Sequence, residues 1–276
     1  MVADAGAAGH ARGMSAFDPA RLWDALGRIA PLALAEPWDN VGLLVEPPQP
    51  RPLRRVLLAI DLTEAVLDEA LAVEADCVVA YHPPLFNSLK RLTLSDPKQR
   101  ILLRAVAAGL PLYSPHTALD AAPGGINDWL LEAFGPLAEV APITPSALDA
   151  AAGGGRRAVL ATPRALGDLL PAIKGLLGLQ HVRVAAADDR PIRTVAVCPG
   201  AGGSLFEGLR GVDLVLTGEL RHHDVLALVA RGTAAVVTDH THTERGYLPR
   251  LAARLRAATG LEVHVSTVDD DPLVVC

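Results

Sequence analysis

The feature of this sequence that most constrains its fold is the placement of its histidines. Six of the nine histidines lie at the ends of four short apolar segments that are predicted to be β-strands. They are His82, His116, His222, His223, His240 and His242. In α/β proteins, ligand-binding side chains gather at the carboxyl ends of such strands. The sequence therefore predicts an α/β fold in which several strands deliver side chains for binding or catalysis.

The chain alternates predicted strands and helices. Arg55 to Ile60 and Cys77 to Ala80 are predicted strands on either side of a helix from Thr63 to Glu74, an order that favours parallel strands. The alternation resumes after a stretch rich in Ala, Pro and Gly between Gly135 and Gly155, where we expect the chain to pass from one domain to the other. Residues 1–16 lack the apolar centre of a signal peptide and are predicted to be a disordered tail.

One cluster in the last quarter of the chain combines two imidazoles with two carboxylates. It reads Asp239-His240-Thr241-His242-Thr243-Glu244-Arg245-Gly246. A helix is predicted from Glu244 to Ala258, and residues four apart on a helix share a face, with Cβ atoms about 5–6 Å apart. His240 and Glu244 are therefore candidate ligands of one metal ion, and a solvated helix start is the alternative. Arg245 fits either a contact with an anionic substrate group or a surface position.

Two other strand ends offer ligands of the same kind. His82 precedes two prolines that restrict the backbone, and His116 stands four residues before Asp120 in a Pro-bounded loop. With His240 and Glu244 they supply three imidazoles and two carboxylates, which suits Zn, Mn or Fe and is enough for a dinuclear site. The alternatives are a capping or core role for His82 and a hydrogen-bonded turn at His116 and Asp120.

Two further motifs each fit two interpretations. His222 or His223 fits a role in general acid–base chemistry or in a substrate contact, with Glu219 as a partner. The run His222-His223-Asp224 fits equally well the N-terminus of a helix that is capped by Asp224. The glycine loop from Gly200 to Gly203 fits either a phosphate cradle of backbone N–H groups or a tight turn.

Composition excludes some classes of protein. The net charge of −6 and a pI near 5.8 argue against a general nucleic-acid surface. No charge-free run approaches the roughly 18–20 residues of a membrane span, so no membrane partner is expected. The three cysteines are far apart and form no CxxC pair, which indicates a reducing compartment and favours the cytoplasm.

Several motifs together resemble the NGG-interacting-factor-like family, also known as GTP cyclohydrolase I type 2 homologues. They are Trp38-Asp39-Asn40-Val41-Gly42-Leu43, Tyr81-His82-Pro83-Pro84-Leu85-Phe86, Ser114-Pro115-His116-Thr117-Ala118-Leu119-Asp120, Thr217-Gly218-Glu219-Leu220-Arg221-His222-His223-Asp224 and Asp239 to Gly246. The resemblance implies a two-domain α/β fold with mixed sheets flanked by helices and a metal site in the cleft between domains. Domain 1 would comprise residues 17–135 plus 240–276, and domain 2 residues 136–239. It also implies a homohexamer.

The same resemblance implies a dinuclear metal centre with two divalent ions per chain. Carried over position by position, the ligands are His82, His116, Asp120, His240 and Glu244. Many members have two adjacent histidines where this chain has Tyr81 and His82, so a phenol or a water would take the first place.

The implied function is metal-dependent hydrolysis of a nucleotide or related heterocycle, as in a GTP cyclohydrolase of type 2. In that reaction His222 or His223 is expected to transfer protons. The alternative is a non-catalytic, metal-binding oligomeric scaffold that engages partner proteins.

Overall fold

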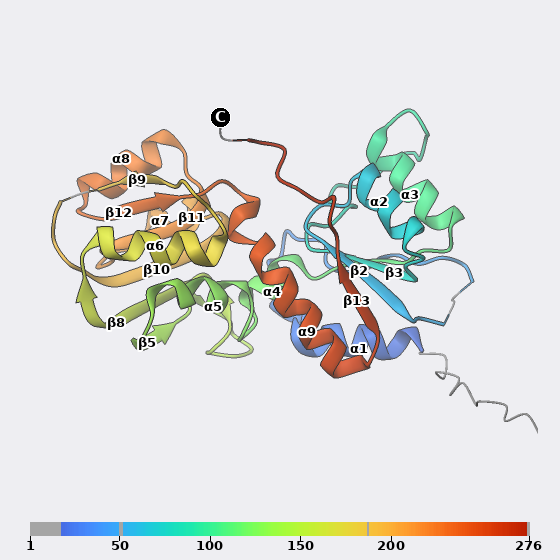
Figure 1. Cartoon of the computed structure of the whole chain (residues 1–276), viewed down its shortest axis with the longest axis horizontal. Helices are drawn as coiled ribbons and strands as arrows, with labels where there is room; N and C mark the ends of the chain where they lie inside the picture. Colours follow the sequence, from blue (N-terminus) through green and yellow to red (C-terminus); the bar gives the residue numbers. More distant parts are fainter. Residues whose placement is uncertain (1–17, 50–51, 187, 275–276) are drawn as a thin grey trace, which may run out of the picture.

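The computed structural model describes residues 18–49, 52–186 and 188–274, and the tail predicted for residues 1–16 lies outside these ranges. Two β-sheets, each flanked by helices, occupy the two halves of the molecule (Figure 1). A third sheet consists of two short paired strands, β6 (Thr144–Pro145) and β7 (Gly153–Gly154). The expected mixed α/β fold is confirmed.

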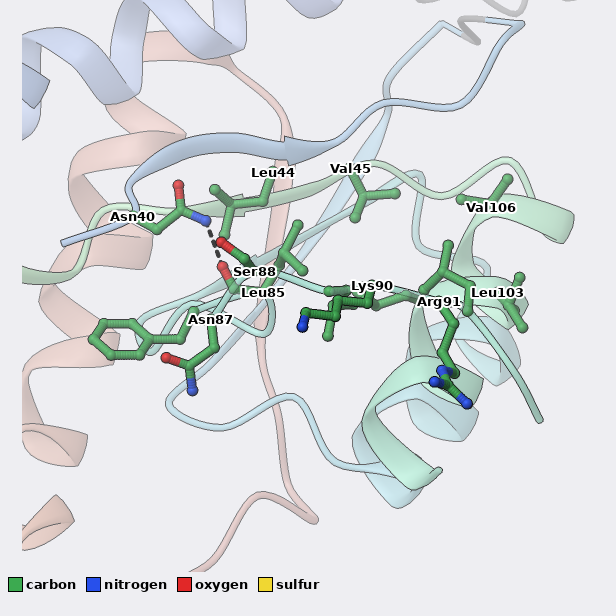
Figure 2. Close-up of a pocket in the computed structure, with 14 residues that line it drawn as sticks. Asn40, Leu44, Val45, Leu85, Asn87, Ser88, Lys90, Arg91, Leu103 and Val106 are labelled. Atoms are coloured by element: carbon green, nitrogen blue, oxygen red, sulfur yellow. Dashed lines mark hydrogen bonds between the residues drawn. The ribbon is translucent and has the colours of Figure 1, made fainter. Parts of the chain in front are cut away.

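The first sheet has five strands in the order β1, β4, β3, β2, β13. In that order their bounds are Gly42–Val45, Leu112–Ser114, Cys77–Ala80, Arg55–Ala59 and Glu262–Val265. All neighbours are parallel except β1 and β4. The loop that follows β3 lies beside β1 and α3 (Pro97–Ala107) (Figure 2).

Alternate residues of the first sheet enter two different cores. Leu57 and Val78 pack with α2 (Glu64–Ala72) and α3. Val56 and Val79 belong to the cluster that includes α1 (Pro19–Ile29) and α9 (Leu248–Thr259). Since side chains alternate across a strand, helices cover both faces of this sheet, and its functional side chains must lie at its edges or ends.

The second sheet has six strands in the order β5, β8, β10, β11, β12, β9. In that order their bounds are Leu137–Ala141, Arg156–Arg164, Ile192–Ala201, Leu214–Glu219, Ala234–Val237 and Arg183–Ala185. The three central strands β10, β11 and β12 are parallel, and the outer pairs are antiparallel.

The second sheet is also covered on both faces. One face packs on α7 (Gly203–Glu207) and α8 (His222–Ala230). Residues of the other face share a cluster with α5 (Ile126–Leu131) and α6 (Leu166–Leu177). This cluster also holds the α1 and α9 side of the first sheet, so one continuous core joins the two halves. We propose residues 17–135 plus 240–276 and residues 136–239 as the two domains.

The helix predicted from Glu244 begins later than expected. Two single 3₁₀ turns come first, η3 (Thr241–Thr243) and η4 (Arg245–Tyr247), and α9 starts at Leu248. Pro249 explains this start, because proline is favoured in the first turn of a helix, where its missing N–H is not needed. In the described ranges, no helix has the length and apolar character needed to cross a membrane.

Candidate metal centre

The carboxyl ends of the parallel strands in both sheets lead to one cavity. His82 follows β3, His116 and Asp120 lie on α4 (His116–Ala121) directly after β4, and His240 and Glu244 follow β12. A cavity of about 520 Å³ is lined by His116, Asp120, His240 and Glu244. The ring of His82 lies 5.4 Å from those of His116 and His240, between centroids. The structure thus brings together all five residues proposed as metal ligands.

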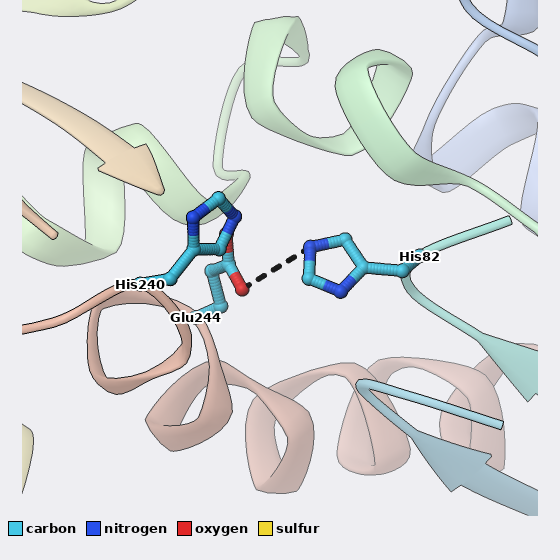
Figure 3. Close-up of side chains that lie close together, drawn as sticks. All are labelled: His82, His240 and Glu244. Carbon is cyan, nitrogen blue, oxygen red and sulfur yellow. Dashed lines mark ion pairs between the residues drawn. The ribbon is translucent and has the colours of Figure 1, made fainter. Parts of the chain in front are cut away.

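Three of these side chains form a tight group (Figure 3). Nε2 of His82 lies 3.5 Å from Oε2 of Glu244, and Nε2 of His240 lies 3.5 Å from Oε1. These distances are close to the roughly 3.4 Å that separates nitrogen and oxygen ligands around one tetrahedral zinc ion. Glu244 is 2% exposed, and its Oε2 has no hydrogen-bond partner. Because an incompletely paired buried carboxylate is unfavourable, the group fits a cation.

Asp120 and Tyr81 form the adjacent wall of the cavity. The Tyr81 hydroxyl donates to Oδ1 of Asp120 at 2.7 Å. Burial, followed by the nearby carboxylates of Asp120 and Glu244, raises the pKa of Tyr81 well above its usual value. The phenol therefore stays protonated and acts as a donor to Asp120.

Each of the three imidazoles has its Nδ1 beside a carboxylate. The pairs are His82 with Asp61 at 3.0 Å, His116 with Asp39 at 2.8 Å and His240 with Glu219 at 3.3 Å. A carboxylate that accepts a proton from Nδ1 fixes the ring orientation and leaves the lone pair of Nε2 for a metal ion. This arrangement has hydrogen-bond geometry at His82 and His116 and is typical of histidines that bind metals.

The sequence patterns do not predict these three pairings. Glu219 was assigned to His222 and His223 but pairs with His240 instead. Asp61 follows β2 at a strand end, so the signal that identified the histidines applied to it as well. Asp39 lies in a turn, and nothing local distinguishes it from a turn residue.

The glycine loop at the end of β10 packs directly against the ligands. A Cβ on Gly200 would lie 2.8 Å from Nε2 of His240 and 2.9 Å from Oε1 of Glu244, so only glycine fits there. The N–H of Gly200 donates to Oγ1 of Thr243, and the N–H of Gly202 to Oγ1 of Thr217. Since these two N–H groups are already used within the fold, the structure favours the tight-turn interpretation over the phosphate cradle.

His222 and His223 lie apart from this group. They are the first two residues of α8, both are exposed, and their ring centroids are 5.4 Å apart. Neither is among the residues that line the cavity. Oδ2 of Asp224 accepts from the N–H of Arg221, as expected for a helix N-terminus. A catalytic role for the two histidines stays a prediction.

The segment 266–271, which we call the C-terminal strap, connects the loops around the site. Oδ2 of Asp269 accepts from the N–H of Ile60 at 2.6 Å and lies 2.8 Å from Nη1 of Arg245. Asp271 accepts from Oγ1 of Thr241 at 2.6 Å. Arg245 is therefore held by Asp269 and its side chain is only 18% exposed, which disfavours the surface position, while a contact with a substrate anion stays a prediction. The strap joins the loop that carries Asp61 to the turns that carry His240 and Glu244.

Metal binding is expected to release protons and to strengthen with pH. Burial alone would lower the pKa of His82, but the carboxylates of Asp61 and Glu244 outweigh it and raise that pKa to about 10. Burial raises the pKa of Asp120 to about 7, despite the hydrogen bond from Tyr81. At pH 7 an ion binding both residues must displace about one to two protons, because it needs the deprotonated forms.

The proton count sets the slope of metal affinity with pH. Below pH 7 both protons must leave, so affinity should rise by about a hundredfold per unit, and above pH 7 by about tenfold. Calorimetric titration with Zn²⁺ in two buffers of different ionisation enthalpy measures the released protons. An affinity that does not change between pH 6 and 8 would contradict the assigned ligands.

Comparison with known proteins shows extensive similarity along the chain. A sequence model of the family Duf34/NIF3 (NGG1p interacting factor 3) matches residues 19–272. The chain is 43% identical over 255 residues to the Protein NIF3 homolog of Schizosaccharomyces pombe, which covers 87% of this chain and 91% of that protein. It is 35% identical over 258 residues to NGG1-interacting factor 3 of Saccharomyces cerevisiae, with 86% and 90% covered.

The fold is also similar to solved structures. The crystal structure of a Bacillus cereus protein related to NIF3 superposes with a TM-score of 0.80 at 20% sequence identity. The match covers 93% of this chain and 98% of the other. At this level of identity the comparison establishes the shared fold.

Proposed function

Because this chain belongs to the Duf34/NIF3 (NGG1p interacting factor 3) family, we propose that it is a dinuclear metal-binding protein and a metal-dependent hydrolase. Its substrate is a nucleotide or a related heterocycle, as for a GTP cyclohydrolase I type 2 homologue. The metal site lies in the cleft where the strand ends of the two sheets meet.

One observation carries the proposal, namely the buried carboxylate of Glu244 between two imidazoles. Its oxygens lie 3.5 Å from His82 and from His240, and the ligand atoms of the three residues all lie within 4.8 Å of one another. We propose that this group would hold one divalent ion and that His116 and Asp120 would hold a second. Nitrogen and carboxylate ligands without thiolates suit Zn, Mn or Fe.

The residues around the cavity prepare it for hydrolysis. When bound, a divalent ion supplies Lewis-acid chemistry and lowers the pKa of a coordinated water toward neutrality. Tyr81 orients Asp120 through its hydroxyl, Asp61 and Asp39 hold the imidazoles of His82 and His116 in one tautomer, and Glu219 lies beside Nδ1 of His240. Such preorganised groups need no rearrangement when the substrate reacts.

We propose His222 and His223 as the groups that exchange protons with the substrate. Arg221, the residue before them, lines a second hollow of about 600 Å³. Glu219, which pairs with His240, lines the same hollow, so it opens beside the metal site. The start of α8 therefore lies at a hollow that shares Glu219 with the metal site.

We further propose that the chain assembles as a homohexamer and acts in the cytoplasm. The cytoplasmic assignment rests on Cys77 and Cys198, which are free thiols. Such thiols are normal in a reducing compartment.

The proposal predicts turnover that depends on both the metal and Glu244. Purified protein reconstituted with Mn²⁺ or Zn²⁺ is to be assayed against GTP and other nucleotides. We expect Glu244→Gln to reduce kcat by at least about a hundredfold, since outer partners of metal ligands alone contribute about 10–100-fold. Glu139→Gln, the same change on the exposed edge strand β5, is the control.

A scaffold is the second candidate, favoured by the name of the yeast relative, an interacting factor. It becomes the better account if no nucleotide is consumed while His116→Ala abolishes metal binding and oligomer formation. Metal-dependent turnover lost in Glu244→Gln would exclude a purely non-catalytic scaffold.

A further inference from the structure

A groove of about 870 Å³ runs between β1, α3 and the loop after β3 (Figure 2). Its floor is apolar and includes Leu44, Leu85 and Leu103. Lys90 extends along the groove toward Asn87 (Figure 2). No ligand of the candidate metal centre lines this groove, and the proposed chemistry does not use it.

The groove begins at the metal centre. Phe86 lines the groove, and Trp38 lines the metal cavity. Their ring centroids are 6.1 Å apart, and both rings meet the imidazole of His116 edge-on, at 6.2 Å for Trp38 and 6.5 Å for Phe86. Asn40 also donates a hydrogen bond to the carbonyl of Leu85, which fixes the two loops together. Groove and cavity therefore meet at an aromatic corner beside a metal ligand.

The aromatic corner faces solvent. Trp38 is 62% exposed and Phe86 is 45% exposed. Large aromatic side chains are usually covered, and an exposed pair at a cavity mouth is typical of a binding surface. An exposed indole offers a flat face on which a planar ring stacks.

The charge of the groove distinguishes it from the hollow on the other side of the site. Lys90 and Arg91 are the only charged residues that line the groove within the described ranges. In the hollow near α8, four carboxylates outnumber two guanidinium groups. They are Glu207, Glu219, Asp224 and Asp239, against Arg183 and Arg221. In a chain of net charge −6, an anionic group is therefore attracted to the groove and repelled from the hollow.

We propose that the metal centre acts on a planar heterocycle that carries an anionic group, with the ring against Trp38 and the anion in the groove at Lys90 and Arg91. The proposal rests on the proposed function and adds the class and the orientation of the substrate. Phosphate and carboxylate share the required charge, and the probes below select between an anionic and an uncharged ligand.

The test compares GTP with guanosine on metal-loaded protein by calorimetric titration. GTP is expected to bind more tightly. The double variant Lys90→Glu with Arg91→Glu should lower the affinity for GTP by about tenfold or more, because each exposed ion pair contributes up to about 1 kcal/mol. The affinity for guanosine should stay unchanged. Trp38→Leu should lower the affinity for GTP and for guanosine alike, by about tenfold, because both ligands stack their ring on the indole.

The matched control reverses two charges in the rival hollow, through Arg183→Glu with Arg221→Glu. It should leave the ratio of GTP to guanosine affinity unchanged. The proposed substrate orientation is overturned if only this control variant lowers the ratio of GTP to guanosine affinity. It is also overturned if the Lys90→Glu and Arg91→Glu changes leave GTP affinity unchanged. In both cases the proposed hydrolase stands. If neither GTP nor guanosine binds and no nucleotide is turned over, both proposals fall.

Discussion

Glu244→Gln is expected to remove most of the stabilisation that divalent metal ions give this protein. A ligand at a hundred times its Kd stabilises a folded protein by about 2.7 kcal/mol. If the variant binds a hundredfold more weakly, about 0.4 kcal/mol remains at the same concentration. The effect is large because the buried carboxylate contacts both His82 and His240. Urea unfolding with and without Zn²⁺ measures the difference.

The design of this experiment isolates the ligand role. The gain from metal is compared within each variant, so any change in the metal-free baseline cancels. Glu139→Gln should keep the full gain, because Glu139 is exposed on the edge strand β5. A gain in Glu244→Gln equal to that of the parent protein would show that Glu244 does not bind the ion.

The second large effect is expected at Arg156, whose side chain is 2% exposed in the interior. Its Nε donates to Asp128 at 2.6 Å, and its two Nη atoms donate to four backbone carbonyls. These are Gly153, Gly155, Ala121 and Ala122. Arg156→Ala removes one donor from each of these acceptors and opens a cavity. We expect it to lower the free energy of unfolding by about 3–5 kcal/mol, measured by urea denaturation.

The neighbouring residue supplies the control. Arg157 points to the other face of β8, is exposed, and donates a single hydrogen bond to the carbonyl of Gly211. Arg157→Ala should change the free energy of unfolding by about 0.5 kcal/mol at most. Equal losses in the two variants would mean that the buried network of Arg156 adds nothing. Arg156 also holds the end of α4, so its loss should loosen the helix that carries His116 and Asp120.

The sequence was sufficient to predict the fold class and to place the candidate ligands at strand ends. Parallel strands place their carboxyl ends together, so His82 and His116 had to lie near each other once β3 and β4 were recognised. The ends of β3 and β4 lie near the end of β12 only because the two sheets pack against each other. Local sequence patterns carry no information about that packing. The motif resemblance supplied that expectation.

The partners of the ligands were not predictable in the same way. Asp39 lies 77 residues from His116, and Asp61 lies 21 residues from His82. The periodicity of a helix or strand carries no information about such pairs. The boundary of α9 was missed for a different reason, because a pattern of apolar residues does not separate two 3₁₀ turns from the first turn of an α-helix.

The C-terminal strap is the last part of the site to be synthesised. The ribosome makes Asp61 and His82 early, but Asp269, which accepts from the N–H of Ile60 and pairs with Arg245, is made after every ligand. A nascent chain therefore exposes His82 and His116 while the turns that complete the group are still missing. We therefore expect the proposed metal group to reach its final geometry only after residue 269 has left the ribosome.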